Sequence, residues 1–505
     1  MCYVSHYGGG QKLDAPLAKK IFDGIHTATT GVGMEMRVDF AEDLETVDHC
    51  MQAETQTSPR RSNSPEDYSL LSALRDRRSR RFGRGMKIPA GPLAYGSKHA
   101  PAPLTEDEEA ALVFAACGIT GHALADLAYA RGEGGNIMAG LVARTIASGD
   151  GLQTVALVVT NDSGTHLVRR PAELPAAEIP KLISMAQRSE FTEAYRRTRV
   201  KIKDGRAAPP TEPLFNINAN RWAAHAPGTS YFLPINDLTL MYINGLLEIL
   251  NEDTGVFVLD ERNGYRPAGL AKFARSRGGH LHDDPTKLRV ATIRQVEQFV
   301  TEFVTAEQGM MLQNLGLMAQ ALGLGGYPNF ANHEFGWFEA LGFRMQRMPA
   351  SRYLGVSSLI ALGMRLTRRD VEIPYPVGLE RNGEVLLKPF CPPYFATMSD
   401  AVRAVVELKF GSSGVFRSDG HGSAWTNHHA TTNAVPKVSD AAIAATIAYC
   451  EYVWGRYGRF PVYMPPYKTV LGFQACHVDA EFYDRFYRPE ALAETQRKDW
   501  KNQHR

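Results

Sequence analysis

Five consecutive residues, Arg77-Arg78-Ser79-Arg80-Arg81, place four guanidinium groups and one hydroxyl in a single short segment. Each guanidinium is a planar, permanently charged fork that suits paired hydrogen bonds to phosphate oxygens. The serine hydroxyl can donate to the same oxygens. The segment is therefore typical of a phosphate-binding site for a nucleotide-like cofactor. A solvated basic turn or a nonspecific polyanion patch is the alternative interpretation.

Two glycine-rich segments could bring backbone close to such a cofactor. Gly134-Gly135-Asn136 comes shortly before a β-branched run at residues 152–160, and Gly323-Leu324-Gly325-Gly326 follows a long apolar stretch. Because glycine has no side chain, the backbone there can approach another group closely. Taken alone, Asn136 after two glycines is also typical of a turn.

A strand pair and a long helix are predicted to position these segments. Residues 152–160 and 166–169 predict two strands joined by a turn. Residues 292–322 predict the longest helix, since apolar side chains from Val296 to Val304 recur at i, i+3, i+4, i+7 and i+8. Glycine at position 323 is a typical helix stop.

A second helix is predicted to begin after Thr105 and to run to about Ala130. Thr105 can cap its first turn, and Glu108, three residues on, completes a capping box. Its small apolar residues indicate a buried helix.

In this order the arginine segment, the asparagine loop before a strand and the helix ending in Ala-Leu-Gly-Leu-Gly at 321–325 resemble the nitroreductase family of FMN-dependent flavoproteins. The resemblance covers residues 68 to about 170 and about 292 to 395. It implies an α+β fold, with a central, mostly antiparallel sheet flanked by helices and one long central helix. It also implies FMN as the bound cofactor.

The resemblance assigns cofactor contacts residue by residue. Arg77 and Arg81 would hold the FMN phosphate, while Arg78 and Ser79 would contact phosphate or ribityl oxygens. Asn136 would bond the edge of the flavin ring. Backbone N–H groups of Gly323, Leu324 and Gly325 would face the flavin. Lys388 would supply a second positive charge to the phosphate.

The length of the chain predicts more than a minimal domain of this kind. We expect residues 1–66 to be a poorly ordered N-terminal extension. Residues 67–400 would form the FMN-binding domain with an insertion at about 171–290. Residues 401–505 would be a C-terminal extension that acts as a lid or a dimerisation element. The flavin would lie in a homodimer or in an internal pseudo-dimer.

The expected activity is hydride transfer from NAD(P)H, a transient reductant, through the flavin to an electron-poor acceptor such as a nitro-aromatic or a quinone. No side chain is expected to be a catalytic nucleophile, because the cofactor carries the chemistry. One alternative is a dehydrogenase or dehalogenase variant of the same family. Another is a non-catalytic protein that binds or sequesters flavin.

Composition narrows the remaining classes. The net charge of +2 and the lack of basic–aromatic interleaving disfavour a nucleic-acid-binding protein. The six cysteines are scattered without a CxxC pair, so neither a zinc ribbon nor a disulfide scaffold is expected. The histidines near 280 and 428 lack typical ligand spacing, so no metal site is expected. With no signal peptide or membrane span in view, we expect a cytoplasmic protein without a membrane partner.

Overall fold

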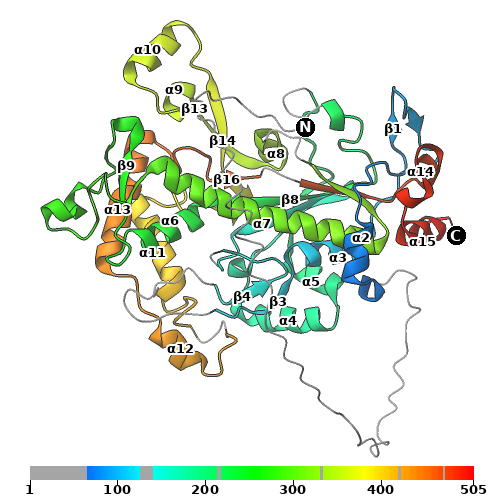
Figure 1. The fold of residues 1–505 in the computed structure, drawn as a ribbon, viewed down its shortest axis with the longest axis horizontal. Helices are drawn as coiled ribbons and strands as arrows, with labels where there is room; N and C mark the ends of the chain where they lie inside the picture. Colours follow the sequence, from blue (N-terminus) through cyan, green and yellow to red (C-terminus); the bar gives the residue numbers. More distant parts are fainter. Residues whose placement is uncertain are drawn as a thin grey trace, which may run out of the picture. The chain divides into compact units, whose positions relative to one another are not determined.

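Helix α7 (Ile293–Leu322) is 30 residues long and packs against the main sheet of the protein. Figure 1 shows it as the long green helix beside the strands. The computed structural model describes residues 65–125, 140–149, 151–212, 218–329, 334–418, 422–469 and 472–504. The expected N-terminal extension, apart from residues 65 and 66, lies outside these ranges.

The main sheet has seven strands, in the order β12-β17-β8-β5-β6-β7, with β16 also pairing with β8. Every pair in it is antiparallel. The strands are β5 (Val155–Thr160), β6 (Gly164–Val168), β7 (Arg199–Asp204), β8 (Ser230–Asp237), β12 (Gly325–Asn329), β16 (Tyr467–Lys468) and β17 (Gly472–Cys476). The combination of this sheet with long helices confirms the expected α+β class.

Strand β5 explains how the sheet is buried on both faces. Val155, Leu157 and Val159 pack into the same apolar cluster as α7 and α3 (Glu106–Cys117). Ala156 and Val158 alternate with them and face a second cluster that contains Trp337 and Phe343. A strand covered on both faces reads as a continuous apolar run. The strand, turn and strand predicted around residues 152–169 are confirmed.

Helix α7 begins and ends where the sequence predicts. Thr292 caps its first turn and forms a reciprocal capping box with Gln295. Gly323 ends it with a left-handed backbone, φ 83°. Its first half, from Val296 to Val304, packs with a helical cluster, and its second half packs with α3 and the sheet. The helix therefore joins the two apolar cores.

The helical cluster consists of α6, α11 and α13, which contact one another and pack around the start of α7. Their bounds are α6 (Leu238–Ile249), α11 (Met398–Phe410) and α13 (Asp440–Tyr457). A small sheet of β9 (Phe257–Asp260), β10 (Arg266–Pro267) and β11 (Val290–Thr292) adjoins them. Buried residues in this cluster include Tyr242, Tyr449 and Phe460.

A third sheet rises from the main body after β12. It is formed by β13 (Phe343–Pro349), β14 (Glu372–Arg381) and β15 (Glu384–Leu387). Helix α8 (Glu334–Ala340) packs on it, and α9 (Ala350–Tyr353) and α10 (Ser358–Leu366) connect β13 to β14. In Figure 1 α10 lies at the top, away from the strands of the main sheet, whereas α8 and the three strands pack on that sheet through the cluster that contains Trp337, Phe343 and Leu379.

Helix α3 is shorter than predicted. It ends at Cys117, because Gly118 takes an extended conformation, and β3 (Ile119–His122) follows and pairs with β4 (Val142–Arg144). Residues 126–130 of the predicted helix lie outside the described ranges. The other elements are α2 (Leu70–Asp76), β1 (Lys87–Ile88), β2 (Tyr95–Gly96), α4 (Ile179–Gln187), α5 (Phe191–Thr198), α12 (His428–Ala434), α14 (Ala480–Phe486) and α15 (Glu494–Asn502).

Segments expected to be peripheral supply the middle of the main sheet. Strand β8 comes from the expected insertion at 171–290, and β17 comes from the expected extension at 401–505. These two strands pair with each other. The lid or dimerisation role of residues 401–505 stays a prediction. Within the part of the chain that the structure describes, none of the helices combines the length and apolar character of a membrane span.

We predict that Gly323→Ala lowers the melting temperature. A left-handed backbone costs an L-residue about 1–2 kcal/mol, and a Cβ at position 323 would lie 2.4 Å from the carbonyl oxygen of Thr495. The matched control is Gly309→Ala in the same helix, where a Cβ meets no atom within 4 Å. That variant should be neutral or slightly stabilising. Equal melting temperatures for the two variants, measured by calorimetry, would contradict the role of Gly323.

Candidate functional site

The arginine segment leaves α2 and runs as extended backbone across the ends of two strands. Arg80 forms an antiparallel bridge with Gly326 at the start of β12, and Gly83 forms one with Val478 just after β17. The Arg84 N–H donates to the carbonyl of His477 at 3.0 Å. The backbone of the segment is thus paired on both sides, which fixes the positions from which its side chains extend.

Close backbone approach explains two of the glycines at this crossing. A Cβ at Gly325 would lie 2.8 Å from the carbonyl oxygen of Arg80, and one at Gly83 would lie 2.8 Å from Cys476 Sγ. The arginine segment and the glycine segment that follows α7, far apart in the chain, are therefore in direct contact.

Arg80 points into the protein rather than toward a ligand. Its guanidinium donates to Gln320 Oε1 at 2.6 Å, to the Ala491 carbonyl at 2.7 Å and to the Asp76 carbonyl at 3.3 Å. All three acceptors are neutral oxygens, and burial lowers the pKa of Arg80 below its usual value. The positive charge is therefore not cancelled by a carboxylate in these contacts.

A cleft of about 710 Å³ opens beside this segment. Its lining combines three arginines and a serine with five aromatic side chains, and none of the described residues that line it is acidic. The polar members are Arg78, Ser79, Arg80 and Arg81; the aromatic members are Phe82, Trp222, Phe482, Tyr483 and Tyr487. Such a surface suits an anion that also carries a flat apolar part.

Arg81 is held at the wall of the cleft by side chains from two other segments. Its Nη2 donates to Asn220 Oδ1 at 2.5 Å and to the Ala219 carbonyl at 3.1 Å. Its guanidinium carbon lies 4.6 Å from the ring centre of Tyr327 and 5.1 Å from that of Trp222. Its Nε is buried without a hydrogen-bond partner among the described residues. The side chain is oriented and retains an unused donor.

The other predicted phosphate ligands differ in position. Arg78 and Ser79 are exposed and line the cleft. The Arg78 guanidinium donates to the nearby carbonyls of Arg75 and Arg77, and being exposed it can turn toward a ligand. Arg77 is half-buried and does not line the cleft. Direct contact is therefore available to Arg78, Ser79 and Arg81.

The remaining expected cofactor residues are not gathered at the cleft. Gly323 and Leu324 already donate their N–H groups to the Ala319 carbonyl at the end of α7, and Gly325 is buried between β17 and Arg80. Lys388 is exposed, lies 5.2 Å from the ring centre of Phe395 and is not part of the cleft lining. Asn136 lies outside the described residues. The cofactor roles of these residues stay predictions.

Sequence reasoning missed the aromatic half of the cleft. Phe482, Tyr483 and Tyr487 lie on and just after α14, whose aromatic run indicates only a packed C-terminal helix from the sequence. The structure confirms the helix and adds a second role: the Phe82 N–H donates to Tyr483 Oη at 3.1 Å, which ties α14 to the arginine segment. Trp222 carries no motif that would have singled it out.

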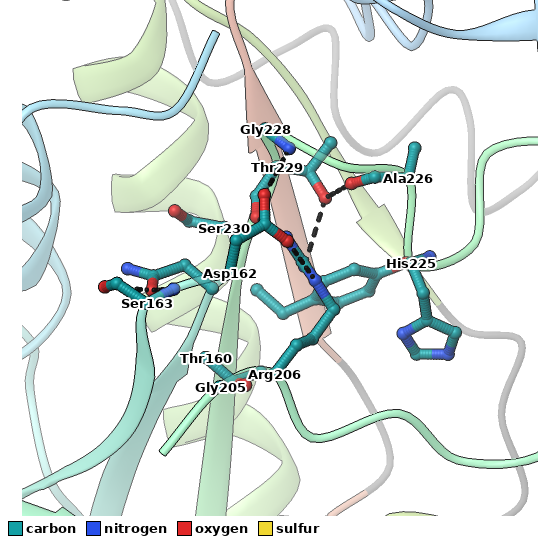
Figure 2. A network of polar contacts seen from close by, with 12 residues as sticks. Thr160, Asp162, Ser163, Gly205, Arg206, His225, Ala226, Gly228, Thr229 and Ser230 are labelled. Carbon is teal, nitrogen blue, oxygen red and sulfur yellow. Dashed lines mark hydrogen bonds and ion pairs between the residues drawn. The ribbon is translucent and has the colours of Figure 1, made fainter. Parts of the chain in front are cut away.

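A polar network holds the loop that delivers Asn220 and Trp222. Asp162, in the turn between β5 and β6, accepts from Arg206 Nη2 at 2.7 Å and from the Gly228 N–H at 2.6 Å. Arg206 Nη2 also donates to the Thr229 carbonyl at 2.5 Å. Figure 2 shows these contacts with His225 beside them. The loop is therefore clamped just before it enters β8.

His225 in this loop has an unusual environment. Its φ of 56° is left-handed, and neither ring nitrogen has a hydrogen-bond partner within the described ranges. The ring stacks on Tyr231 with a 5.4 Å centroid distance. Burial, aided by Arg206, lowers the pKa of His225 to about 4, so the imidazole is neutral near pH 7.

His477 is buried behind the cleft between two carboxylates. Its Nδ1 lies 2.9 Å from Asp499 on α15, and its Nε2 lies 3.5 Å from Glu108 on α3. Burial by itself lowers the pKa of His477, but the two carboxylates outweigh it and raise the pKa to about 9. These are the side chains with metal-ligand chemistry that come together in the described part of the chain. The two carboxylates face opposite ring nitrogens. We therefore interpret the three side chains as a protonated His477 that pairs with Asp499 and Glu108.

Comparison with known proteins gives little further information. No protein-family model matches the sequence, and no curated protein matches it. Among solved structures, the chain is similar to a candidate nitroreductase from Ralstonia eutropha, with 13% sequence identity and a TM-score of 0.26. The match covers 57% of this chain and 80% of that chain. A TM-score of this size does not establish a shared fold.

We predict that His477 makes stability depend on pH. Its folded-state pKa is raised from 6.5 to about 9, so its stabilisation is fully present below pH 6.5 and is lost as the pH rises through about 9. The melting temperature of the wild type should fall over that window. His477→Gln should be less stable at pH 6 and should lose much of this pH dependence. The same slope in both proteins would contradict the ion-pair assignment.

Proposed function

We propose that the protein is an FMN-dependent oxidoreductase that transfers hydride from NAD(P)H to an electron-poor acceptor such as a nitro-aromatic or a quinone. The observation that carries this proposal is the cleft that Arg78, Ser79 and Arg81 line together with aromatic side chains. The motif order in the sequence, with its resemblance to the nitroreductase family, supports the same cofactor.

Charge favours a phosphate at the arginine end of the cleft. Arg78 and Arg81 can contact it directly, and buried Arg80 adds positive potential because its three acceptors are neutral. Among the residues that the structure describes, the lining contains no acidic side chain to oppose these charges. Charge-assisted hydrogen bonds to a dianion are about twice as strong as neutral ones.

Size and apolar character favour an aromatic ring system in the same cleft. A volume of about 710 Å³ lies within the range typical of cofactor sites. Trp222 and Tyr487 line the cleft together with the buried Phe82–Phe482 pair, whose ring centres are 4.1 Å apart, and make the lining largely apolar. FMN combines a phosphate with a flat ring, and when bound it supplies the hydride-transfer chemistry. The chain's own residues would bind and orient it.

A flavin-binding protein without turnover is the second candidate. The described lining of the cleft includes no histidine or carboxylate that could move a proton. Its titratable groups other than arginine are Tyr483 and Tyr487, and burial raises the pKa of Tyr483, which keeps that hydroxyl protonated. A protein that only holds the flavin would need no more than this.

We predict that Arg78→Ala weakens FMN binding by about tenfold or more, because a charge-assisted hydrogen bond contributes about 1.5–3 kcal/mol. Riboflavin, which lacks the phosphate, should bind both proteins equally. Titration followed by flavin fluorescence measures both affinities. Arg188→Ala is the matched control, since Arg188 is exposed, pairs with Glu190 and does not line the cleft. An unchanged FMN affinity in Arg78→Ala would contradict the assignment of Arg78 as a phosphate ligand.

We predict that the FMN-loaded protein bleaches when mixed anaerobically with NADH or NADPH and regains its colour with a quinone. This separates the two candidates, because a protein that only holds flavin would stay yellow. Failure to take up FMN at all, judged from the visible spectrum after gel filtration, would exclude both.

A further inference from the structure

Helix α10 has no buried side chain along its nine residues. It lies in the connection between β13 and β14, away from the strands of the main sheet (Figure 1). Ser357 caps its first turn by accepting from the Ile360 N–H, so the helix is locally well formed. Burial in a core therefore does not explain the apolar residues of α10.

An apolar ridge runs along the outer side of α10. Leu359, Leu362 and Leu366 follow the spacing i, i+3, i+7, which places them on one face. Their side chains are 81%, 53% and 76% exposed. Ala361 and Met364, on the opposite side, are less exposed. The ridge therefore points away from the protein, whereas a surface helix normally turns such a ridge toward the core.

Neighbouring residues extend this apolar surface. Leu354, Ile360 and Val371 are also exposed by half or more. Contiguous exposed apolar side chains on a soluble fold mark an interaction surface.

Positive charge borders the ridge at one end. Arg365, Arg368 and Arg369 are exposed at the end of α10 and just beyond it. Arg365 pairs with Asp370 at 3.4 Å, while Arg368 and Arg369 form no ion pair among the described residues. Residues 350–366 contain no aspartate or glutamate, and the acidic residues that follow the arginines are Asp370 and Glu372. Apolar and basic side chains are thus combined on one short helix.

We propose that α10 docks on an anionic lipid surface. The leucine ridge would enter the boundary between headgroups and acyl chains, with the helix lying in the plane of the interface. Arg365, Arg368 and Arg369 would meet the negatively charged headgroups. This goes beyond the proposed oxidoreductase function and revises the expectation, from the sequence, of no membrane partner. It requires no membrane-spanning helix.

A second copy of the chain is a poorer occupant for this surface. In a parallel pair of α10 helices the three arginines of each copy would face one another. In an antiparallel pair they would face the first turn of the partner copy's α10, where the helix N-terminus carries a positive partial charge, and residues 350–357 before it, which contain no aspartate or glutamate. A lipid surface offers negative charge wherever the arginines fall.

The test uses the purified full-length protein and sedimentation with vesicles. One set is phosphatidylcholine alone, and the other contains about 30% phosphatidylserine, which gives a surface potential that attracts basic segments. We expect binding to the anionic vesicles that weakens as salt is raised. No binding to them would overturn the proposal, and equal binding to both sets would overturn the role of charge.

Variants assign the contact to α10. Leu359→Ser/Leu362→Ser/Leu366→Ser should weaken vesicle binding by about tenfold or more and leave the melting temperature nearly unchanged, since these side chains are exposed. Leu70→Ser/Leu71→Ser in α2 is the matched control, because these leucines are 65% and 77% exposed. An equal loss in both variants would overturn the assignment. A concentration-dependent dimer abolished by the triple variant would instead identify a second copy as the occupant and overturn the proposal.

Discussion

The contact between Arg80 and Gln320 is the interaction on which the candidate site depends. It joins the arginine segment to the last turn of α7, and Gln320 also bonds Thr495 on α15 through its side chain and its carbonyl. Removing either partner would leave a buried polar group unsatisfied, which costs more than the bond itself contributes. Three segments distant in sequence therefore meet at one amide, and the cleft is built around it.

This contact also decides the electrostatic character of the cleft. A buried guanidinium is usually paired with a carboxylate, since an unpaired charge in a poor solvent is costly. Here the acceptors are an amide and two carbonyls, so the charge is solvated by dipoles without being cancelled. Arg78 and Arg81 then extend the same positive region into solvent. An anion that enters the cleft meets the fixed guanidinium of Arg81 and the exposed guanidinium of Arg78, with the buried charge of Arg80 behind them.

Local rules explain what the sequence could predict. The bounds of α7 follow from Thr292 and Gly323, and the strand pair follows from a β-branched run broken by Asn161 to Gly164. Each of these signals affects only the backbone within a few residues of it. The membership of β8 and β17 in the middle of the sheet could not be predicted in this way, because strand partners are chosen by long-range packing. The same limit applies to the site: the arginines carry a motif, whereas Trp222 and Tyr483 become part of the cleft only through the fold.

The position of β17 changes how the C-terminal third relates to the site. A lid is a part that can be displaced, but β17 lies between β12 and β8, and its removal would expose unpaired backbone on both neighbours. The residues that follow β17 form α14 and α15. Helix α14 lines the cleft with aromatic side chains, and α15 contacts Gln320. Any movement that opens the cleft is therefore better carried by surface segments that do not pair in the sheet. The arginine segment bridges β12 and the residue just after β17, and α14 follows β17, so the arginines and the aromatic side chains of α14 are attached to the same pair of strands.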